Sequence, residues 1–318
     1  MAAAIGRGLE RAGLEPPDLC PIADGGEGTL DVLLTALGGE TAGATVADPL
    51  GRPRAAGFGL IEEGATAIVE LAQASGLDLM TPRGGTGSGA GRPSAADAER
   101  ASTRGTGELI AAAIDAGAEV VLVAAGGSAT TDGGAGAIAA LEESGGLRGA
   151  ALVVLCDVRT PFEEAAVRFA PQKGADDAAV ERLTLRLAAL AATWPRDPRG
   201  VPMTGAAGGL SGGLWAHFGA RLEAGAPFVL EALGFDARMR AAHAVVTGEG
   251  RIDRTSLEGK AAGEVAIRAR QAGVPAHAIV GTRALDLFDQ RILDLQTIRE
   301  AGTLPAIEAA AEALAADL

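Results

Sequence analysis

The sequence is short of several residue types. It contains no Tyr, no Asn and only two lysines, Lys173 and Lys260, among its 27 basic residues. Together with an excess of Ala, Gly and Arg, these absences are typical of a chain encoded by a very GC-rich genome. Where Arg has replaced Lys almost everywhere, a lysine that remains is a candidate for a task that needs a compact ammonium group and not a planar guanidinium.

Two further shortages argue against whole classes of protein. Cys20 and Cys156 are the only cysteines and form no C-x-x-C motif, which argues against a disulfide framework or a zinc site and favours a reducing compartment. The 41 acidic residues outnumber the 27 basic ones, and the net charge of -14 argues against a nucleic-acid partner or an anionic membrane surface. The chain shows neither a run of about 18 uncharged apolar residues nor the apolar segment of a signal peptide. We therefore expect a cytoplasmic protein that binds neither nucleic acid nor membranes.

The sequence does contain an α/β rhythm over 318 residues, enough chain for about two domains. Short apolar runs alternate with Ala- and Leu-rich stretches, and Gly clusters lie at the junctions. Continuous apolar strands joined through helices indicate parallel sheets covered on both faces. The expected strands are residues 43–47, 54–61, 66–71, 119–125, 151–156, 243–247 and 277–281; the expected helices are residues 2–13, 29–37, 106–116, 133–143 and 176–193; a flexible loop is expected at residues 83–94.

The junction after the strand at residues 119–125 is the richest in glycine. Glycines within residues 126–136 allow the backbone to turn tightly and to approach an anion, and the helix that follows adds a partial positive charge. A phosphate would fit there. The motif matches neither G-x-G-x-x-G nor the Walker pattern, and a tight turn with Ser or Asp as the helix cap is the structural alternative.

Two other Gly-rich junctions carry acids. Residues 24–29 bring Asp24 and Glu27 into a turn that enters a helix, where acids hold a divalent cation, accept a hydrogen bond from a substrate hydroxyl or cap the helix. Residues 247–260 follow the strand at residues 243–247 and bring Glu249, Asp253 and Lys260 near its end. Ligands of parallel sheets collect at the carboxyl ends of strands, so this junction is a second candidate site.

In their order along the chain, these junctions and several further segments resemble the type-1 glycerate kinases, which transfer the γ-phosphoryl group of ATP to D-glycerate. The matching segments are residues 24–29, 48–51, 104–108, 126–136, 156–158, 171–174, 205–213 and 247–260. The resemblance implies an α/β fold of two domains, a flavodoxin-like (Rossmann-like) parallel-sheet domain with an inserted smaller mixed α/β domain. We expect the first domain at residues 1–42, 100–145 and 236–318, and the inserted one at residues 43–99 and 146–235.

The resemblance also implies roles in phosphoryl transfer, a reaction that depends on positioning and charge neutralisation. The residues expected to bind the nucleotide phosphates are Gly126, Gly127, Ser128, Thr130, Gly133 and Gly134. One or two of Asp132, Asp157 and Asp253 would hold Mg²⁺. The residues expected at the small substrate are Gly25, Gly26, Glu27, Arg104 and Arg251.

The remaining roles concern the transferred proton and the charge on the phosphoryl group. Either Asp24 or Glu249 would accept the proton of the attacking hydroxyl. Lys173 and Lys260 would stabilise the transferring group. The expected product is 2-phosphoglycerate, with the 3-phosphate as the alternative, and a homodimer is the assembly considered.

The chain departs from the family pattern in several places, of which the first leaves other functions open. Family members begin with a strand before the helix expected at residues 2–13, and the explanation favoured here is a start codon assigned too far downstream. Thr131 stands where the family commonly has Asn. The alternatives are an inactive or binding-only paralogue that lacks the first strand, and a kinase for another small hydroxy acid.

Overall fold

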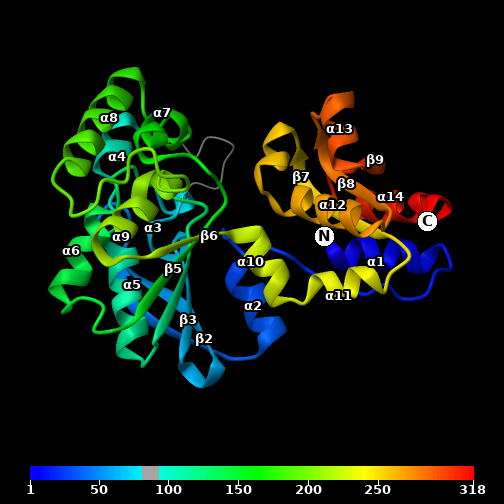
Figure 1. The fold of residues 1–318 in the computed structure, drawn as a ribbon, viewed down its shortest axis with the longest axis horizontal. Helices are drawn as coiled ribbons and strands as arrows, with labels where there is room; N and C mark the ends of the chain where they lie inside the picture. Colours follow the sequence, from blue (N-terminus) through cyan, green and yellow to red (C-terminus); the bar gives the residue numbers. More distant parts are fainter. Residues whose placement is uncertain (81–92) are drawn as a thin grey trace. The chain divides into compact units, whose positions relative to one another are not determined.

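The computed structural model describes residues 1–80 and 93–318, so most of the loop expected at residues 83–94 lies outside the described residues. The chain forms two compact units. We call residues 24–225 the central unit, and residues 1–23 together with 226–318 the terminal unit. Figure 1 shows the elements of each unit.

This division differs from the expected ranges. Residues 100–145 were expected with both termini, yet they belong to the central unit. The reason is strand pairing: residues 120–124 lie between two other strands of the central sheet, paired with residues 66–70 on one side and 151–155 on the other. The boundaries expected at residues 42 and 235 lie instead at residues 23 and 225, and the central unit is the larger of the two.

The sheet of the central unit is mixed, and most of it is parallel. Its strands follow one another across the sheet in chain order. They are β1 (Glu40–Ala47), β2 (Pro53–Ile61), β3 (Thr66–Glu70), β4 (Val120–Ala124), β5 (Ala151–Cys156) and β6 (Arg221–Ala224). The first three pair antiparallel, and β3 to β6 pair parallel, which brings the carboxyl ends of β3, β4 and β5 to one edge.

Helices cover both faces of this sheet (Figure 1). One face is packed by α5 (Arg104–Asp115), α6 (Ala135–Glu143) and α9 (Leu210–Phe218), which bury apolar side chains against Phe58 and Val123 of the strands. The opposite face carries α2 (Thr29–Leu37), for which Gly59 of β2 leaves room. A Cβ at Gly59 would lie 2.5 Å from Leu30 Cδ1, so the Leu30 side chain would have to shift to accommodate a larger residue there.

Further elements complete the central unit. Its other helices are α3 (Ala72–Ser75), α4 (Ala95–Arg100), α7 (Ala165–Phe169) and α8 (Asp177–Ala191), and α10 (Gly225–Ala232) begins at its last residue and continues in the terminal unit. The 3-10 turns are η1 (Glu62–Gly64), η2 (Leu77–Met80), η3 (Phe162–Glu164), η4 (Pro171–Lys173) and η5 (Ala206–Gly209).

The terminal unit is built on a three-stranded parallel sheet in chain order. Its elements are α1 (Ala2–Arg11), α11 (Phe235–Arg240), β7 (Val245–Ile252), η6 (Arg254–Glu258), α12 (Ala261–Ala272), β8 (Ala276–Arg283), α13 (Leu287–Leu293), β9 (Leu295–Glu300), α14 (Leu304–Leu314) and η7 (Ala315–Asp317). Alternate residues of β8 face opposite layers: Ile279 packs with α1 and α14, whereas Ala278 and Val280 pack with α11 and α12.

The fold class predicted from the sequence is confirmed: both units are α/β and contain parallel sheets covered by helices. Two strands, β6 and β9, were not expected, because their sequences Arg-Leu-Glu-Ala and Leu-Gln-Thr-Ile-Arg-Glu contain no continuous apolar run. One expectation was wrong in detail. Residues 248–252 are part of β7 and not a loop, because Glu249 and Arg251 pair with Val280 and Thr282 of β8.

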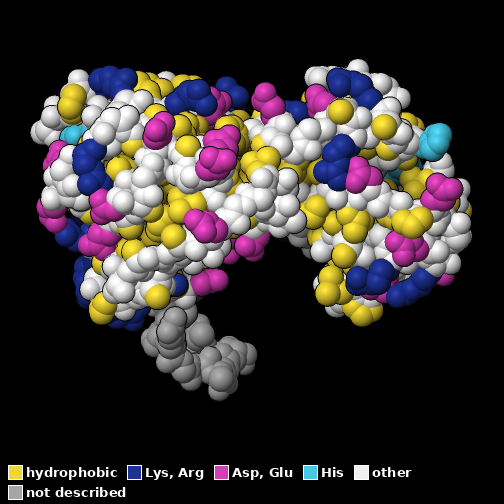
Figure 2. All heavy atoms as spheres, turned by 90° about the horizontal axis from the view of Figure 1, so that it is seen from below, with side chains coloured by type: hydrophobic (Ala, Val, Ile, Leu, Met, Phe, Trp, Pro, Cys, Tyr) yellow, Lys and Arg dark blue, Asp and Glu magenta, His cyan; other side chains and the backbone are white. Residues whose placement is uncertain are grey.

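Two observations concern the surface. In the part of the chain that the structure describes, no helix combines the length and the apolar character needed to cross a membrane. Acidic side chains are scattered over both units on the face drawn in Figure 2, interspersed with Lys and Arg. The net charge of -14 is therefore not gathered into one large patch on that face.

Candidate active site

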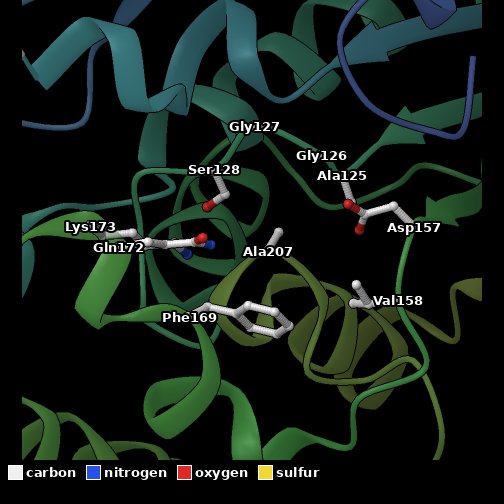
Figure 3. Close-up of a pocket in the computed structure, with 10 residues that line it drawn as sticks. All are labelled: Ala125, Gly126, Gly127, Ser128, Asp157, Val158, Phe169, Gln172, Lys173 and Ala207. Carbon is white, nitrogen blue, oxygen red and sulfur yellow. The ribbon is translucent and has the colours of Figure 1, made fainter. Parts of the chain in front are cut away.

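A pocket opens in the central unit where β4 and β5 end. It contains about 350 Å³ of unfilled space, part of it open to solvent. The lining residues are Ala125, Gly126, Gly127, Ser128, Asp157, Val158, Phe169, Gln172, Lys173 and Ala207. Figure 3 shows Lys173 and Gln172 entering from one side and Asp157 and Val158 from the other. The structure thus brings together five of the residues singled out from the sequence, at the sheet edge where ligands of parallel sheets bind.

The two Gly-rich loops of the central unit pack directly against each other. Gly126 N donates a hydrogen bond to Gly25 O over 3.0 Å. A Cβ at Gly126 would lie 2.5 Å from Gly26 Cα, and one at Gly25 would lie 2.9 Å from Leu155 O. Gly25 also has a φ of +92°, which other residues rarely adopt. Glycine at these positions therefore allows close backbone packing of the two loops, and Gly126 itself lines the pocket together with Gly127.

The hydroxyl groups expected at the phosphates have internal partners. Ser128 Oγ accepts a hydrogen bond from Thr130 N and lies 3.0 Å from Thr130 Oγ1. Ser128 lines the pocket, whereas Thr130 is fully buried. Gly133 and Gly134 are also buried, and their Cα positions face Leu187, Phe162 and Leu210. Of the six residues expected at the nucleotide, Gly126, Gly127 and Ser128 reach the pocket.

Lys173 is a buried cation that lines this pocket. Only 2% of the residue is exposed, and Nζ donates a 2.5 Å hydrogen bond to Thr130 O. Burial lowers the pKa of Lys173 to about 7, although the negative charges of Asp132 and Asp157 act to raise it. An arginine would keep its charge at any physiological pH, so a lysine suits this buried position better.

The lowered pKa predicts a pH-dependent stability. The unfolded chain keeps the Lys173 proton up to an ordinary pKa near 10.5, whereas the folded protein releases it above about 7. Between these values the unfolded state binds more protons, so Lys173 makes the free energy of unfolding rise with pH by up to about 1.4 kcal/mol per pH unit. Urea unfolding at pH 7 and about pH 9 should show this rise in the wild type relative to Lys173→Met. A stability difference between the two proteins that does not change with pH would contradict it.

The three carboxylates considered for Mg²⁺ have different surroundings. Asp132 is 8% exposed and its oxygens accept from Thr103 N, Thr103 Oγ1, Gly134 N and Gly136 N, so it caps the starts of both α5 and α6. Asp157 lines the pocket. Asp253 belongs to the terminal unit and caps η6 through Thr255 N. Asp157 is therefore the carboxylate that faces ligand space in the pocket.

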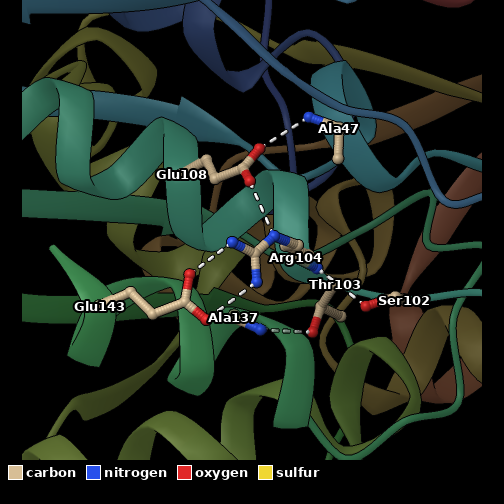
Figure 4. Close-up of polar contacts among 7 residues, drawn as sticks. All are labelled: Ala47, Ser102, Thr103, Arg104, Glu108, Ala137 and Glu143. Atoms are coloured by element: carbon tan, nitrogen blue, oxygen red, sulfur yellow. Dashed lines mark hydrogen bonds and ion pairs between the residues drawn. The ribbon is translucent and has the colours of Figure 1, made fainter. Parts of the chain in front are cut away.

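Arg104 lies away from the pocket lining. Its guanidinium pairs with Glu108 at 2.9 Å and with Glu143 at 2.5 Å, and Glu108 in turn accepts from Ala47 N (Figure 4). The hydrogen bonds to Glu143 raise the pKa of Arg104 above its ordinary value. The arrangement ties α5 to α6 and to the end of β1, and it occupies the group that was expected to bind the substrate carboxylate.

These partners predict a small functional effect for Arg104→Ala. Because the guanidinium is 43% exposed, water and salt screen both ion pairs and each adds little to stability. The variant should unfold at slightly lower urea concentration and keep the Michaelis constant for its substrate within about twofold. A tenfold rise of that constant with unchanged stability would show that Arg104 binds substrate.

The acidic loop beside the pocket has mixed surroundings. Glu27 is exposed, and its Oε1 would lie 2.6 Å from a Cβ at Gly127, so this carboxylate reaches the pocket-lining loop. Asp24 is half-buried, and its backbone carbonyl packs against Gly225. Both residues belong to the central unit.

The terminal unit holds a separate polar cluster at the end of β7. Glu249 Oε1 accepts from Ser256 Oγ over 2.7 Å, and Arg251 Nε pairs with Asp253 Oδ2 at 3.1 Å. Hydrogen bonds from Thr255, the charge of Lys260 and the contact with Arg251 lower the pKa of Asp253. The structure thus brings together all four terminal-unit residues singled out from the sequence.

One segment next to the pocket was missed from the sequence. Residues 70–77 run alongside the Gly126 loop, with Leu77 N donating to Gly127 O and Ala129 N donating to Ser75 O, both over 2.9 Å. Glu70 ends β3 as a buried acid. The sequence did offer a clue, because Glu70 is an acid at the end of an apolar run, much as Asp157 comes directly after one, but residues 66–71 were interpreted only as a strand.

The fold and the pocket define the class of protein. A Gly-rich loop, a buried ammonium and a carboxylate meet at the carboxyl ends of neighbouring parallel strands, as in α/β enzymes that act on anionic, phosphorylated ligands.

Comparison with known proteins gives the family. The sequence model of the Glycerate kinase family matches residues 1–146 and 142–315. Glycerate kinase of Bacillus subtilis is 38% identical over 84% of this chain and 76% of its own length, and Glycerate 2-kinase of Escherichia coli is 35% identical over the same shares. A crystal structure from Salmonella typhimurium LT2, provisionally named glycerate kinase 2, has a TM-score of 0.76 at 31% identity, covering 99% of this chain and 92% of its own. The chain belongs to the glycerate kinase family, whose members are phosphotransferases with an alcohol acceptor.

Proposed function

We propose that this protein transfers the γ-phosphoryl group of ATP to D-glycerate by direct in-line transfer, giving 2-phospho-D-glycerate, with Mg²⁺ and in the cytoplasm. The observation that carries the proposal is the pocket in which the Gly126 loop, buried Lys173 and Asp157 meet within a chain of this family. The name of the Escherichia coli relative, Glycerate 2-kinase, supports the 2-phosphate as product.

The pocket suits phosphate groups. Backbone around Gly126 and Gly127, with Ser128 Oγ, would hydrogen-bond phosphate oxygens. The ammonium of Lys173, fixed by Thr130 O, would face charge that develops during transfer. Because the ammonium is held before any ligand arrives, little reorganisation is needed during the reaction.

The donor set fits Mg²⁺ bound together with substrate phosphates. Among the described residues, no three His, Cys, Asp or Glu side chains cluster so as to hold a metal ion by themselves. At phosphoryl-transfer sites Mg²⁺ is held by one or two carboxylates plus the phosphates. Asp157 is the carboxylate we propose, since it lines the pocket with Gly126, Ser128 and Lys173, and Asp132 does not. When bound, the ion would neutralise phosphate charge.

The acceptor hydroxyl needs a base and the substrate carboxylate needs donors. We propose Asp24 as the proton acceptor, with Glu249 as the alternative. We also propose that Gly25, Gly26 and Glu27, called the acceptor loop below, bind the acceptor substrate together with the start of α2, which follows them. The partial positive charge at a helix N-terminus favours a carboxylate. In the terminal unit, we propose that Lys260 stabilises the transferring phosphoryl group and that Arg251 binds the small substrate. Single replacement of each residue tests these roles.

A substrate panel tests the proposal. ADP formation would be followed with ATP, Mg²⁺ and either D-glycerate, lactate or another small hydroxy acid. We expect kcat/KM for D-glycerate to exceed that for lactate by about tenfold or more, because a site that hydrogen-bonds an extra hydroxyl rejects the analogue lacking it. Equal turnover of both acids would remove the substrate assignment, and no turnover of any acid would favour a binding-only protein.

A further inference from the structure

Glu70 is a buried carboxylate at the carboxyl end of β3. The residue is 5% exposed, and Oε1 accepts a 2.9 Å hydrogen bond from Leu30 N in the first turn of α2. Burial raises the pKa of Glu70, whereas hydrogen bonds from Leu30, Gly28 and the Gln73 side chain oppose that rise. No ion pair reaches Glu70 from the described residues, 1–80 and 93–318. Two of its three hydrogen bonds therefore come from backbone N–H groups at the helix start, those of Gly28 and Leu30, and the third comes from the Gln73 side chain.

The helix that Glu70 holds begins directly after the acceptor loop. Gly28 is the N-cap of α2 and has a left-handed φ of +89°. The residues before it, Gly25 and Gly26, pack backbone to backbone on Gly126. A shift of the first turn of α2 would therefore move the loop that rests on the pocket lining.

The chain that follows Glu70 fixes the same lining from another direction. Leu71 N donates to Ala124 O, and Leu77 N donates to Gly127 O. These bonds are made by the backbone and do not need the Glu70 side chain. The Glu70 carboxylate thus holds the start of α2 next to residues 24–28, whereas the Gly126 loop is held by separate backbone hydrogen bonds.

We propose that Glu70 is a positioning residue that orients residues 24–28 through the start of α2 and so sets affinity for the acceptor substrate more than for the nucleotide. This inference rests on the proposed function for its kinetic part. The anchoring itself is a structural statement that stands or fails independently.

The test compares Glu70→Ala and Glu70→Gln with the wild type. Amide hydrogen exchange of residues 24–34 should rise at least about tenfold in Glu70→Ala, because buried N–H groups lose a charged acceptor. The Michaelis constant for D-glycerate should rise about tenfold, with kcat within about threefold and the constant for ATP within about twofold. Glu70→Gln keeps an oxygen that accepts from Leu30 N and should recover most of both effects.

Glu62 provides the control at the opposite end of β3. This exposed carboxylate accepts from Thr66 Oγ1 over 2.6 Å, and Glu62→Gln should leave exchange and kinetics at wild-type values. Unchanged exchange at residues 24–34 in Glu70→Ala, or equal increases in both Michaelis constants, would overturn the proposal. If Glu70→Ala does not fold, Glu70→Leu, which fills the space without offering an acceptor to Leu30 N, takes its place with the same expected changes. A wild type without kinase activity would defeat the proposed function, and the exchange result would then decide the role of Glu70 alone.

Discussion

Lys173→Met is expected to lower kcat/KM for D-glycerate by about 10²–10³-fold, the range found when one preorganised donor to developing charge is removed. Methionine is similar in length and suits the buried position, so the pocket keeps its shape while it loses the ammonium. Thr130 O loses its donor, at a cost of about 1–3 kcal/mol. That loss is offset because a buried charge no longer has to be desolvated. Steady-state kinetics measure the loss of activity, and urea unfolding shows whether the variant is still folded, so the effect of the missing charge can be told from unfolding.

Arg168→Met is the matched control for this variant. Arg168 lies on α7 shortly before Lys173, is 54% exposed and pairs with Glu164. It lies outside the pocket lining, so its removal should leave kcat/KM within about twofold. Wild-type activity in Lys173→Met would show that the buried lysine serves the fold alone.

Gly126→Ala is expected to have the second largest effect, a loss of about 1–3 kcal/mol of stability and at least tenfold in kcat/KM. The added Cβ would lie 2.5 Å from Gly26 Cα, so two backbone segments would have to separate. No flexible side chain is available there to relieve the overlap. Their separation would move Ser128 and the acceptor loop away from their positions beside the pocket. Urea unfolding and initial rates measure the two losses.

Gly57→Ala in β2 is the control for a glycine replacement as such. Its added Cβ would meet only Ala42 O at 3.5 Å, an ordinary contact. We expect stability and activity close to wild type. If Gly126→Ala behaves like Gly57→Ala, the close packing of the two Gly-rich loops is not required for function.

Much of the fold could be predicted because its signals are local. The buried strands β4 and β5 are continuous apolar runs, and each is followed by Gly or Asp at the point where the chain turns. Lys173 was singled out from composition as a lysine kept among arginines, and the structure places it, buried, in the pocket lining. The division into units could not be predicted, because it depends on which strands pair across long stretches of chain.

The roles of individual charged residues were harder to predict for a related physical reason. Asp132 and Asp157 both follow strands, yet one is saturated by the starts of two helices, including Thr103, which lies 29 residues away. Arg104 finds Glu143 at a separation of 39 residues. An acid or an arginine in a Gly-rich turn has the same sequence signature whether it caps, pairs or binds a ligand. Only the partners decide, and they are set by the tertiary fold.

The most direct test of the central claim identifies the product. Purified protein would be incubated with ATP, Mg²⁺ and D-glycerate, and the reaction followed by ³¹P NMR against both phosphoglycerates. The account predicts 2-phosphoglycerate formed in equal amount to ADP, with none formed when D-glycerate is omitted. ADP released at the same rate without D-glycerate, or no phosphoglycerate despite a folded protein, would contradict it.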